Sequence, residues 1–130
     1  KHAEWLSLIR IFEKTQRLVV YSLYPEHVPE ARLGRLMELI TRINYGLILG
    51  NFEMDLRDGE IRYKTSIDLE SIDISPVMIR NLVFGNFFSV DLYFYAIQAA
   101  IHGEQSIDQL VYEAEHPQTD VFELVDEAVH

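Results

Sequence analysis

Five histidines are the side chains in this sequence best suited to metal chemistry, because imidazole nitrogen is a common Zn²⁺ ligand. They are His2, His27, His102, His116 and His130. None forms an H-E-x-x-H pattern, in which two histidines four residues apart share one face of a helix. Glu113, Glu115 and His116 come closest, but they share one short turn that we expect to be exposed. The sequence therefore predicts solvated histidines and no metal site.

A run of carboxylates superficially resembles a calcium-binding loop. It comprises Glu53, Asp55, Asp58 and Glu60. The EF-hand pattern D-x-[DN]-x-[DN]-G-x5-E is absent, and the flanking residues alternate as in strands rather than helices. Asp58 and Gly59 form a strong hairpin signal, and an Asp side chain stabilises such a turn through local hydrogen bonds. We interpret these acids as parts of a hairpin.

Nucleophilic and phosphate-binding patterns are absent as well. No G-x-S-x-G elbow occurs. Ser7, Ser22 and Ser66 fall in expected strands, and Ser75 and Ser106 lie at expected helix caps. Gly46 and Gly50 match neither G-x-G-x-x-G nor the P-loop. The sequence predicts no catalytic residue and no cofactor-binding residue, so we interpret the chain as non-enzymatic. A carboxylate pair formed by residues far apart in the sequence stays open as the alternative.

Composition bounds the class of protein. A chain of 130 residues, 48% hydrophobic and 12% aromatic, predicts a single folded domain over residues 1–130. The chain has no cysteine, which excludes a disulfide framework and favours a cytoplasmic location. A net charge of −10 argues against nucleic acid as the main partner, because phosphate binding requires a clustered positive surface.

The negative charge is concentrated in the second half of the chain. Residues 1–65 carry ten basic and nine acidic side chains, whereas residues 66–130 carry one basic residue, Arg80, and twelve acidic ones. An acidic surface suits solubility and a basic or polar protein partner. The near-neutral half leaves room for a modest basic patch around Arg10, Lys14 and Arg17.

Alternating apolar residues predict two hairpins separated by a helix. Residues 4–13 and 17–24 are expected to be the first pair of strands, joined by a polar break at 14–16. A helix over 28–46 presents Leu33, Leu36, Met37, Ile40 and Ile43, and leaves Arg32, Arg35, Glu38 and Arg42 to solvent. Residues 47–56, with Ile48, Phe52, Met54 and Leu56 on one side, and residues 60–68 form the second pair. Gly50 indicates a bulge or a close backbone approach.

A long helix follows the second hairpin. Ser75 is the expected N-cap, Pro76 suits the first turn, and Gly103 ends the pattern after His102. Such a helix is ~42 Å long, whereas a globule of this size is ~36 Å across. We therefore expect it to kink near Gly85 or to extend past its own core. Its charge-free runs reach only ten residues, too short to span a membrane, so no membrane insertion is predicted.

This helix is apolar on nearly every side, so one sheet face cannot cover it. We expect a second chain to cover the remainder, and Tyr and Phe are residues that protein interfaces favour. The candidate dimer or partner surface comprises Phe84, Phe87, Phe88, Tyr93, Phe94 and Tyr95. Asn81, Asp91 and Gln98 form a polar strip, whereas Asn86 is predicted to point away from it.

Residues 106–115 predict a short helix capped by Ser106, and residues 120–129 a terminal amphipathic helix. The resulting order is ββ-α-ββ-α plus a helical tail. The predicted fold class is α+β, an antiparallel β-sheet packed against helices.

Two stretches carry a family resemblance. They are VVYSLYPEHVPE at 19–30 and RINYGLILGNFEMDLRDGEIRYKTSIDLE at 42–70. They resemble the YbjN-like family of bacterial sensory transduction regulators over about residues 17–100. This resemblance implies a fold similar to type III secretion chaperones, commonly a homodimer, with no established catalytic residues. Because that fold begins with a helix and one more strand, we expect either that an N-terminal element is missing before Lys1 or that this chain departs from the fold there.

The leading hypothesis is a homodimeric protein-binding module, a sensory transduction regulator or chaperone-like protein. The alternative is a small-molecule sensor with a pocket between the sheet and the long helix, near Tyr45 and Tyr63. An enzyme ranks last.

Overall fold

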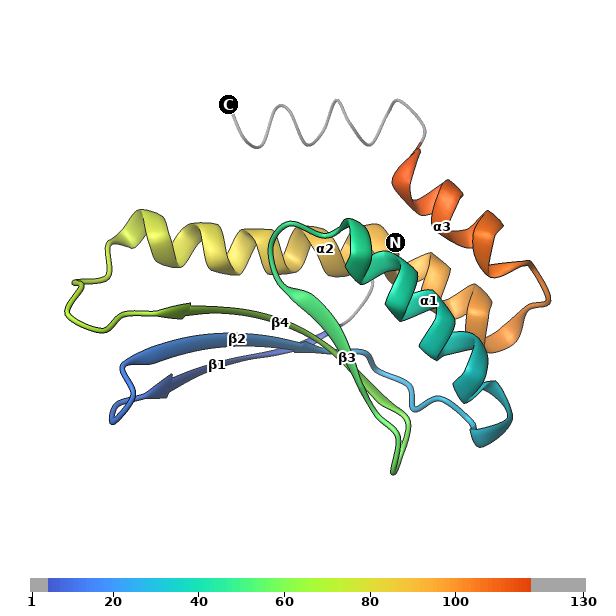
Figure 1. The fold of residues 1–130 in the computed structure, drawn as a ribbon, viewed down its shortest axis with the longest axis horizontal. Helices are drawn as coiled ribbons and strands as arrows, with labels where there is room; N and C mark the ends of the chain where they lie inside the picture. The colour runs from blue at the N-terminus through green and yellow to red at the C-terminus, as the bar shows by residue number, and fades with distance from the viewer. Residues whose placement is uncertain (1–4, 118–130) are drawn as a thin grey trace.

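The computed structural model describes residues 5–117 and has the α+β architecture that the pattern predicts (Figure 1). The elements are β1 (Leu6–Phe12), β2 (Arg17–Leu23), the 3₁₀ turn η1 (Glu30–Arg32), α1 (Leu33–Gly46), β3 (Asn51–Asp55), β4 (Glu60–Asp68), α2 (Pro76–His102) and α3 (Ile107–Glu115). The predicted terminal helix over 120–129 lies outside the described residues.

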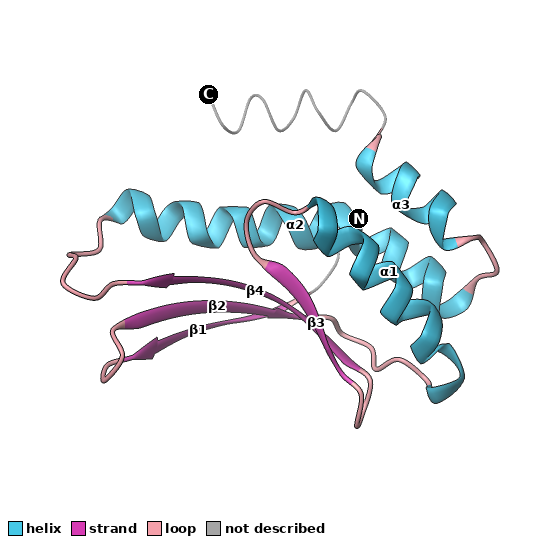
Figure 2. Ribbon diagram, in the orientation of Figure 1, coloured by secondary structure: helices cyan, strands magenta, loops and turns pink. Residues whose placement is uncertain are grey.

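The strands form one antiparallel sheet in the order β1-β2-β4-β3, so β1 and β3 are its edges. The helices pack on one face of this sheet, and the other face carries none of the described helices (Figure 2). Ile61, Tyr63 and Thr65 of β4 point toward the helices and are fully buried. The predicted alternation along β4 is therefore confirmed.

Two glycines allow the second hairpin to fit against its neighbours. Gly59 has φ +79°, and a Cβ there would lie 2.3 Å from the Val28 carbonyl oxygen. The Gly59 carbonyl in turn accepts a hydrogen bond from the Val28 amide at 2.9 Å. Gly50 has φ +74°, and a Cβ there would lie 2.7 Å from the Lys64 carbonyl oxygen. The close backbone approach predicted at Gly50 is confirmed.

The left-handed turn at Gly50 also shortens the strand expected at 47–56. β3 begins only at Asn51, and Ile48 is fully exposed although the alternation placed it beside Phe52. Phe52 is buried, whereas Leu56 is 56% exposed. The prediction for Ile48 and Leu56 was wrong because alternation specifies a face only where the chain stays extended.

α2 begins and ends where the sequence predicts. The Ser75 hydroxyl accepts a hydrogen bond from the Met78 amide at 3.2 Å, Pro76 is the first helical residue, and Gly103 follows the last. The helix runs unbroken through Gly85 along the length of the sheet (Figure 1). Of the two expected solutions, a kink or an extended helix, the structure has the extended helix. Only its second half also packs against α1 and α3, as Figure 1 shows.

Two arginines expected to face solvent instead bind the end of α2. Arg35 donates hydrogen bonds to the carbonyl oxygens of Ala100, at 3.2 Å, and Gln105, at 2.8 Å. Arg32 donates to the Gly103 carbonyl at 2.9 Å. The last carbonyls of a helix lack intrahelical partners, and these guanidinium groups supply the missing donors. Met37 also departs from its prediction, since it is 44% exposed.

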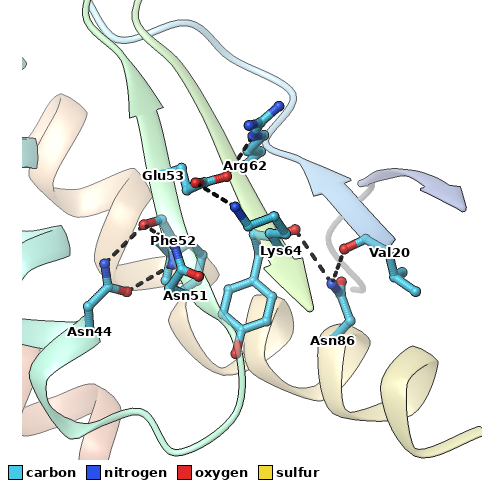
Figure 3. A network of polar contacts seen from close by, with 9 residues as sticks. Val20, Asn44, Asn51, Phe52, Glu53, Arg62, Lys64 and Asn86 are labelled. Carbon is cyan, nitrogen blue, oxygen red and sulfur yellow. Dashed lines mark hydrogen bonds and ion pairs between the residues drawn. The ribbon is translucent and has the colours of Figure 1, made fainter. Parts of the chain in front are cut away.

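A buried polar cluster joins α2 to the centre of the sheet. The Asn86 amide nitrogen donates to the Val20 carbonyl at 3.1 Å and to the Thr65 hydroxyl at 3.3 Å. It also lies 3.5 Å from the Tyr63 carbonyl. The Ser22 hydroxyl donates to the Asn86 amide oxygen at 2.5 Å. Figure 3 shows the contact of Asn86 with Val20. Asn86, Ser22 and Thr65 are fully buried. Asn86 points away from the exposed Asn81, Asp91 and Gln98, as predicted.

We expect Asn86→Ala to lower the free energy of unfolding by ~2–4 kcal/mol, because it leaves buried hydrogen-bonding groups unpaired and creates a cavity. Urea denaturation followed by circular dichroism measures this change. Asn81→Ala, at an exposed position on the same helix, is the control and should change it by less than ~0.5 kcal/mol. Equal effects of the two substitutions would contradict the role of the cluster.

Candidate protein-binding surface

A line of large apolar side chains is exposed on the side of α2 that faces away from the sheet. Phe84 is 61% exposed, Phe88 43% and Tyr95 67%. Val77, on the same side, is 53% exposed. At 100° of rotation per residue, all four side chains project within ~20° of the direction opposite to that of Asn86. We call Val77, Phe84, Phe88 and Tyr95 the α2 outer stripe. Their spacing of seven, four and seven residues is typical of a helix face that packs against another helix.

The other aromatic residues predicted for this surface lie elsewhere on α2. Phe94 is half-buried, with its ring centroid 5.4 Å from that of Tyr24 and 6.2 Å from that of Trp5. Phe87, 40% exposed, lies about 100° around the helix from Asn86, on the same side as Phe94. Both therefore flank the outer stripe instead of belonging to it.

Tyr93 does not belong to any exposed surface of the protomer. Its side chain is 5% exposed and packs edge-on against Phe52 at a centroid distance of 5.8 Å. Burial raises the pKa of the Tyr93 phenol. The apolar pattern of α2 has almost no preferred side, so it could not distinguish this core residue from its exposed neighbours.

The sequence prediction missed a second exposed apolar surface, on β1. Leu6 and Leu8 lie on one face of this strand, Ile9 and Ile11 on the other, and all four are 48–68% exposed. α2 packs chiefly over β2 and β4, so the helix-facing side chains of β1 remain uncovered. The signal was present in the sequence, because residues 6–11 do not alternate apolar with polar side chains as a half-buried strand does.

The histidines of the described residues make ordinary surface contacts. His102 Nε2 lies 2.8 Å from a Glu26 carboxylate oxygen, and His27 Nδ1 lies 3.0 Å from the Asp58 carbonyl oxygen. Within residues 5–117, no group of three or more His, Asp or Glu side chains is arranged to hold a metal ion. His2 and His130 lie outside the described residues.

The two tyrosines near which a pocket was expected do not lie together, and the hollow that Tyr45 borders, of about 580 Å³, lies between α1 and α3. Tyr63 is fully buried and its hydroxyl donates to the Leu49 carbonyl, whereas Tyr45 is 95% exposed on α1. A second hollow, of about 690 Å³, lies between α2 and α3, where Leu92, Tyr95 and Leu110 contribute to its lining. The fold places Tyr45 on the exposed side of α1 and Tyr63 in the core, so the two side chains do not line one pocket.

The model of the YbjN family, described as "putative bacterial sensory transduction regulator", matches residues 1–97 of the chain. The chain belongs to the YbjN family. The match covers the sheet, α1 and most of α2. No curated protein and no solved structure is significantly similar to this chain. The predicted likeness to type III secretion chaperones therefore stays a prediction. No helix in the described part of this YbjN-family chain is long and apolar enough to cross a membrane.

In this YbjN-family chain, polar residues of the 42–70 stretch hold the second hairpin together. The Asn44 side chain accepts a hydrogen bond from the Phe52 amide at 2.8 Å and donates one to the Phe52 carbonyl at 2.9 Å (Figure 3). The Glu53 carboxylate bridges Arg62, at 2.8 Å, and Lys64, at 2.9 Å. These contacts give the stretch a structural role, and none of them places a nucleophile beside a base.

Two carboxylates of this hairpin, Glu53 and Asp55, are ion-paired with basic side chains. Hydrogen bonds from Arg57 lower the pKa of Asp55 to about 2. Partial burial raises the pKa of Glu53, but the hydrogen bonds and charges of Lys64 and Arg62 outweigh it, so the net pKa is lowered from its usual 4.5. Glu53, Asp55, Asp58 and Glu60 thus belong to a turn and its flanking strands, as predicted.

We expect the ion pairs of Glu53 to stabilise this YbjN-family fold above pH 4.5. As the pH falls through the lowered pKa of Glu53, this stabilisation should be lost, because the unfolded chain binds more protons than the folded one. Glu53→Gln should lower the free energy of unfolding at pH 7 by about 0.5–1 kcal/mol. It should also flatten the acid limb of a urea-denaturation series from pH 3 to 6. Glu60→Gln, on the neighbouring strand, is the control. An unchanged acid limb in Glu53→Gln would contradict this assignment.

Proposed function

We propose that this YbjN-family protein is a non-enzymatic regulatory module that binds other proteins and acts as a homodimer in the bacterial cytoplasm. The observation that carries this proposal is the α2 outer stripe, a line of large apolar side chains, three of them aromatic, on an otherwise well-anchored helix. Large apolar patches on a folded domain mark interaction surfaces. Family membership supports a regulatory role and supplies no catalytic residues.

The chemistry of the stripe suits a protein partner better than a small ligand. Phe and Tyr are enriched at protein interfaces, where they bury large areas with few rotatable bonds. From Val77 to Phe88 the stripe is convex, because it lies on the outward side of a helix, whereas small-molecule sites are concave. Tyr95, at the other end of the stripe, borders the hollow between α2 and α3. An apolar helix face on the partner would match both its shape and its spacing.

The half of the chain that contains the stripe is strongly acidic, and this charge would bias the choice of partner. Among residues 66–130 the only basic side chain is Arg80, against twelve acidic ones. A partner whose apolar face is bordered by basic or polar side chains would be favoured, and one with an acidic border would be repelled. Binding should weaken as salt concentration rises, because exposed charges are screened.

The homodimer is tested by size-exclusion chromatography with light scattering at micromolar concentration. We expect twice the mass of one chain, and a single-chain mass across the concentration range would remove the dimer from the proposal.

Partner binding is tested with the double variant Phe84→Asp/Phe88→Asp. Both side chains are exposed, so the fold should persist while the charged residues prevent burial in an interface. Proteins captured from a bacterial lysate by the wild type should be lost with the variant. Tyr45→Asp is the matched control, because it also replaces an aromatic side chain with a carboxylate, at a 95% exposed position on α1. This variant should still capture the same proteins as the wild type. A capture profile shared by all three proteins would exclude the outer stripe as the binding surface.

A further inference from the structure

The hollow between α2 and α3 opens onto the α2 outer stripe. Leu92 and Tyr95 of α2 and Leu110 of α3 contribute to its lining. Tyr95 also belongs to the outer stripe, so the apolar surface continues from the hollow toward Phe88. Pro117, the last residue that the structure describes, lines the same hollow. The chain thus reaches an apolar surface at the point where its C-terminal segment begins.

The direction of α3 leads the chain back along α2. α3 lies beside α1 and runs in the same direction, since Arg35 binds the Gln105 carbonyl and a Cβ at Gly46 would lie 3.4 Å from a Glu115 carboxylate oxygen. Both helices run opposite to α2, as Figure 1 shows. A segment that continued beyond α3 in this direction would pass over the middle of α2.

The sequence that follows Pro117 has the pattern of an amphipathic helix over 120–129. At 100° per residue, its six apolar residues project within an arc of ~160°, and its four acidic residues project into the remainder. An isolated helix of this length is marginal in water, so its apolar face requires a surface to pack on. The apolar residues are Val121, Phe122, Leu124, Val125, Ala128 and Val129, and the acidic ones are Asp120, Glu123, Asp126 and Glu127.

We propose that residues 120–129 bind back on the outer stripe of their own chain and form a cover that a protein partner must displace. A helix of ten residues is ~15 Å long, the length of ten residues of α2. With Pro117 level with Leu92, an antiparallel alignment places Val121 beside Phe88. One turn further, Val125 would lie beside Phe84, so the two central residues of the stripe would be covered.

The charge of α2 suits an acidic cover. From Pro76 to Val90 the helix carries no carboxylate and one basic side chain, Arg80, which is exposed. An acidic segment on this half of α2 would therefore meet one opposite charge and no like charge from the helix itself.

The short connection favours the chain's own segment over a second copy. Only two residues separate Pro117 from Asp120. A segment tethered this closely has an effective concentration in the millimolar range, so a second copy at micromolar concentration competes poorly with it.

The regulatory consequence rests on the protein-binding function proposed above. A partner helix and residues 120–129 would compete for Phe84 and Phe88, so the partner's apparent affinity would fall in proportion to the fraction of chains that are covered. The cover would thus set a threshold for partner binding.

Paired cysteines in the full chain test this contact, because the natural chain has none. The alignment places Val129 near Asn81, which is exposed and lies at the edge of the stripe. Asn81→Cys/Val129→Cys should therefore form an intramolecular disulfide under mild oxidation. Asn81→Cys/Glu127→Cys is the matched control, since its tether is nearly the same length but Glu127 belongs to the acidic side. We expect the first variant to lose at least about fivefold more of its free thiols in a maleimide-polyethylene-glycol gel assay, with circular dichroism confirming that both are folded.

Dye binding provides a second measurement. Phe122→Asp/Val125→Asp should release the cover and raise the fluorescence of anilinonaphthalene sulfonate, which binds exposed apolar surface. Gln118→Asp/Thr119→Asp adds the same charge outside the apolar side and should leave the fluorescence unchanged.

Equal cross-linking of the two cysteine variants, no cross-linking, or dye fluorescence unaffected by Phe122→Asp/Val125→Asp would overturn the proposal. Disulfide-linked dimers in place of the intramolecular product would show that a second copy supplies the cover, which also overturns it. These measurements use no partner protein, so they are independent of the capture experiment. Selective cross-linking with failed capture would remove the protein-binding function and leave the cover, and the reverse result would do the opposite.

Discussion

The buried amide of Asn86 is the constraint on which the arrangement of this protein depends. It lies among backbone and hydroxyl groups of β2 and β4, and a shift of α2 would leave these groups unpaired in an apolar interior. The helix is therefore positioned over the two central strands. Because a helix covers a limited width of sheet, the edge strand β1 stays uncovered, and because Asn86 faces inward, Phe84 and Phe88 must face outward.

The exposed apolar surfaces follow from this arrangement and differ in kind. The outer stripe of α2 offers side chains alone, since the backbone of a helix is internally hydrogen-bonded. β1 offers side chains and, within residues 5–117, a row of backbone donors and acceptors that no described strand pairs with. A helix face selects a partner by shape, whereas a strand edge selects an extended segment in a defined register. The two surfaces therefore suit two different partners on one small domain.

The residues that carry the family likeness turn out to support the scaffold. Asn44 protects the β3 edge, Gly50 and Gly59 allow close backbone contacts, and Glu53 joins two basic side chains across the hairpin. These residues thus hold β3 against β4 and attach the hairpin to α1. The α2 outer stripe, which is proposed to bind a protein partner, lies outside the 42–70 stretch.

The sequence by itself determined the elements whose signals are local. Ser75, Pro76 and Gly103 delimit α2, and Asp58 with Gly59 forms the predicted turn, because caps and turns depend on a few adjacent residues. The tertiary structure alone decided which sides of these elements are covered. Tyr93 is buried while Tyr95 is exposed, Tyr45 and Tyr63 are separated, and Arg32 and Arg35 bind the end of α2 instead of facing solvent. An apolar pattern that surrounds a helix, or lies on both faces of a strand, defines no direction. Only packing against residues distant in the sequence supplies one.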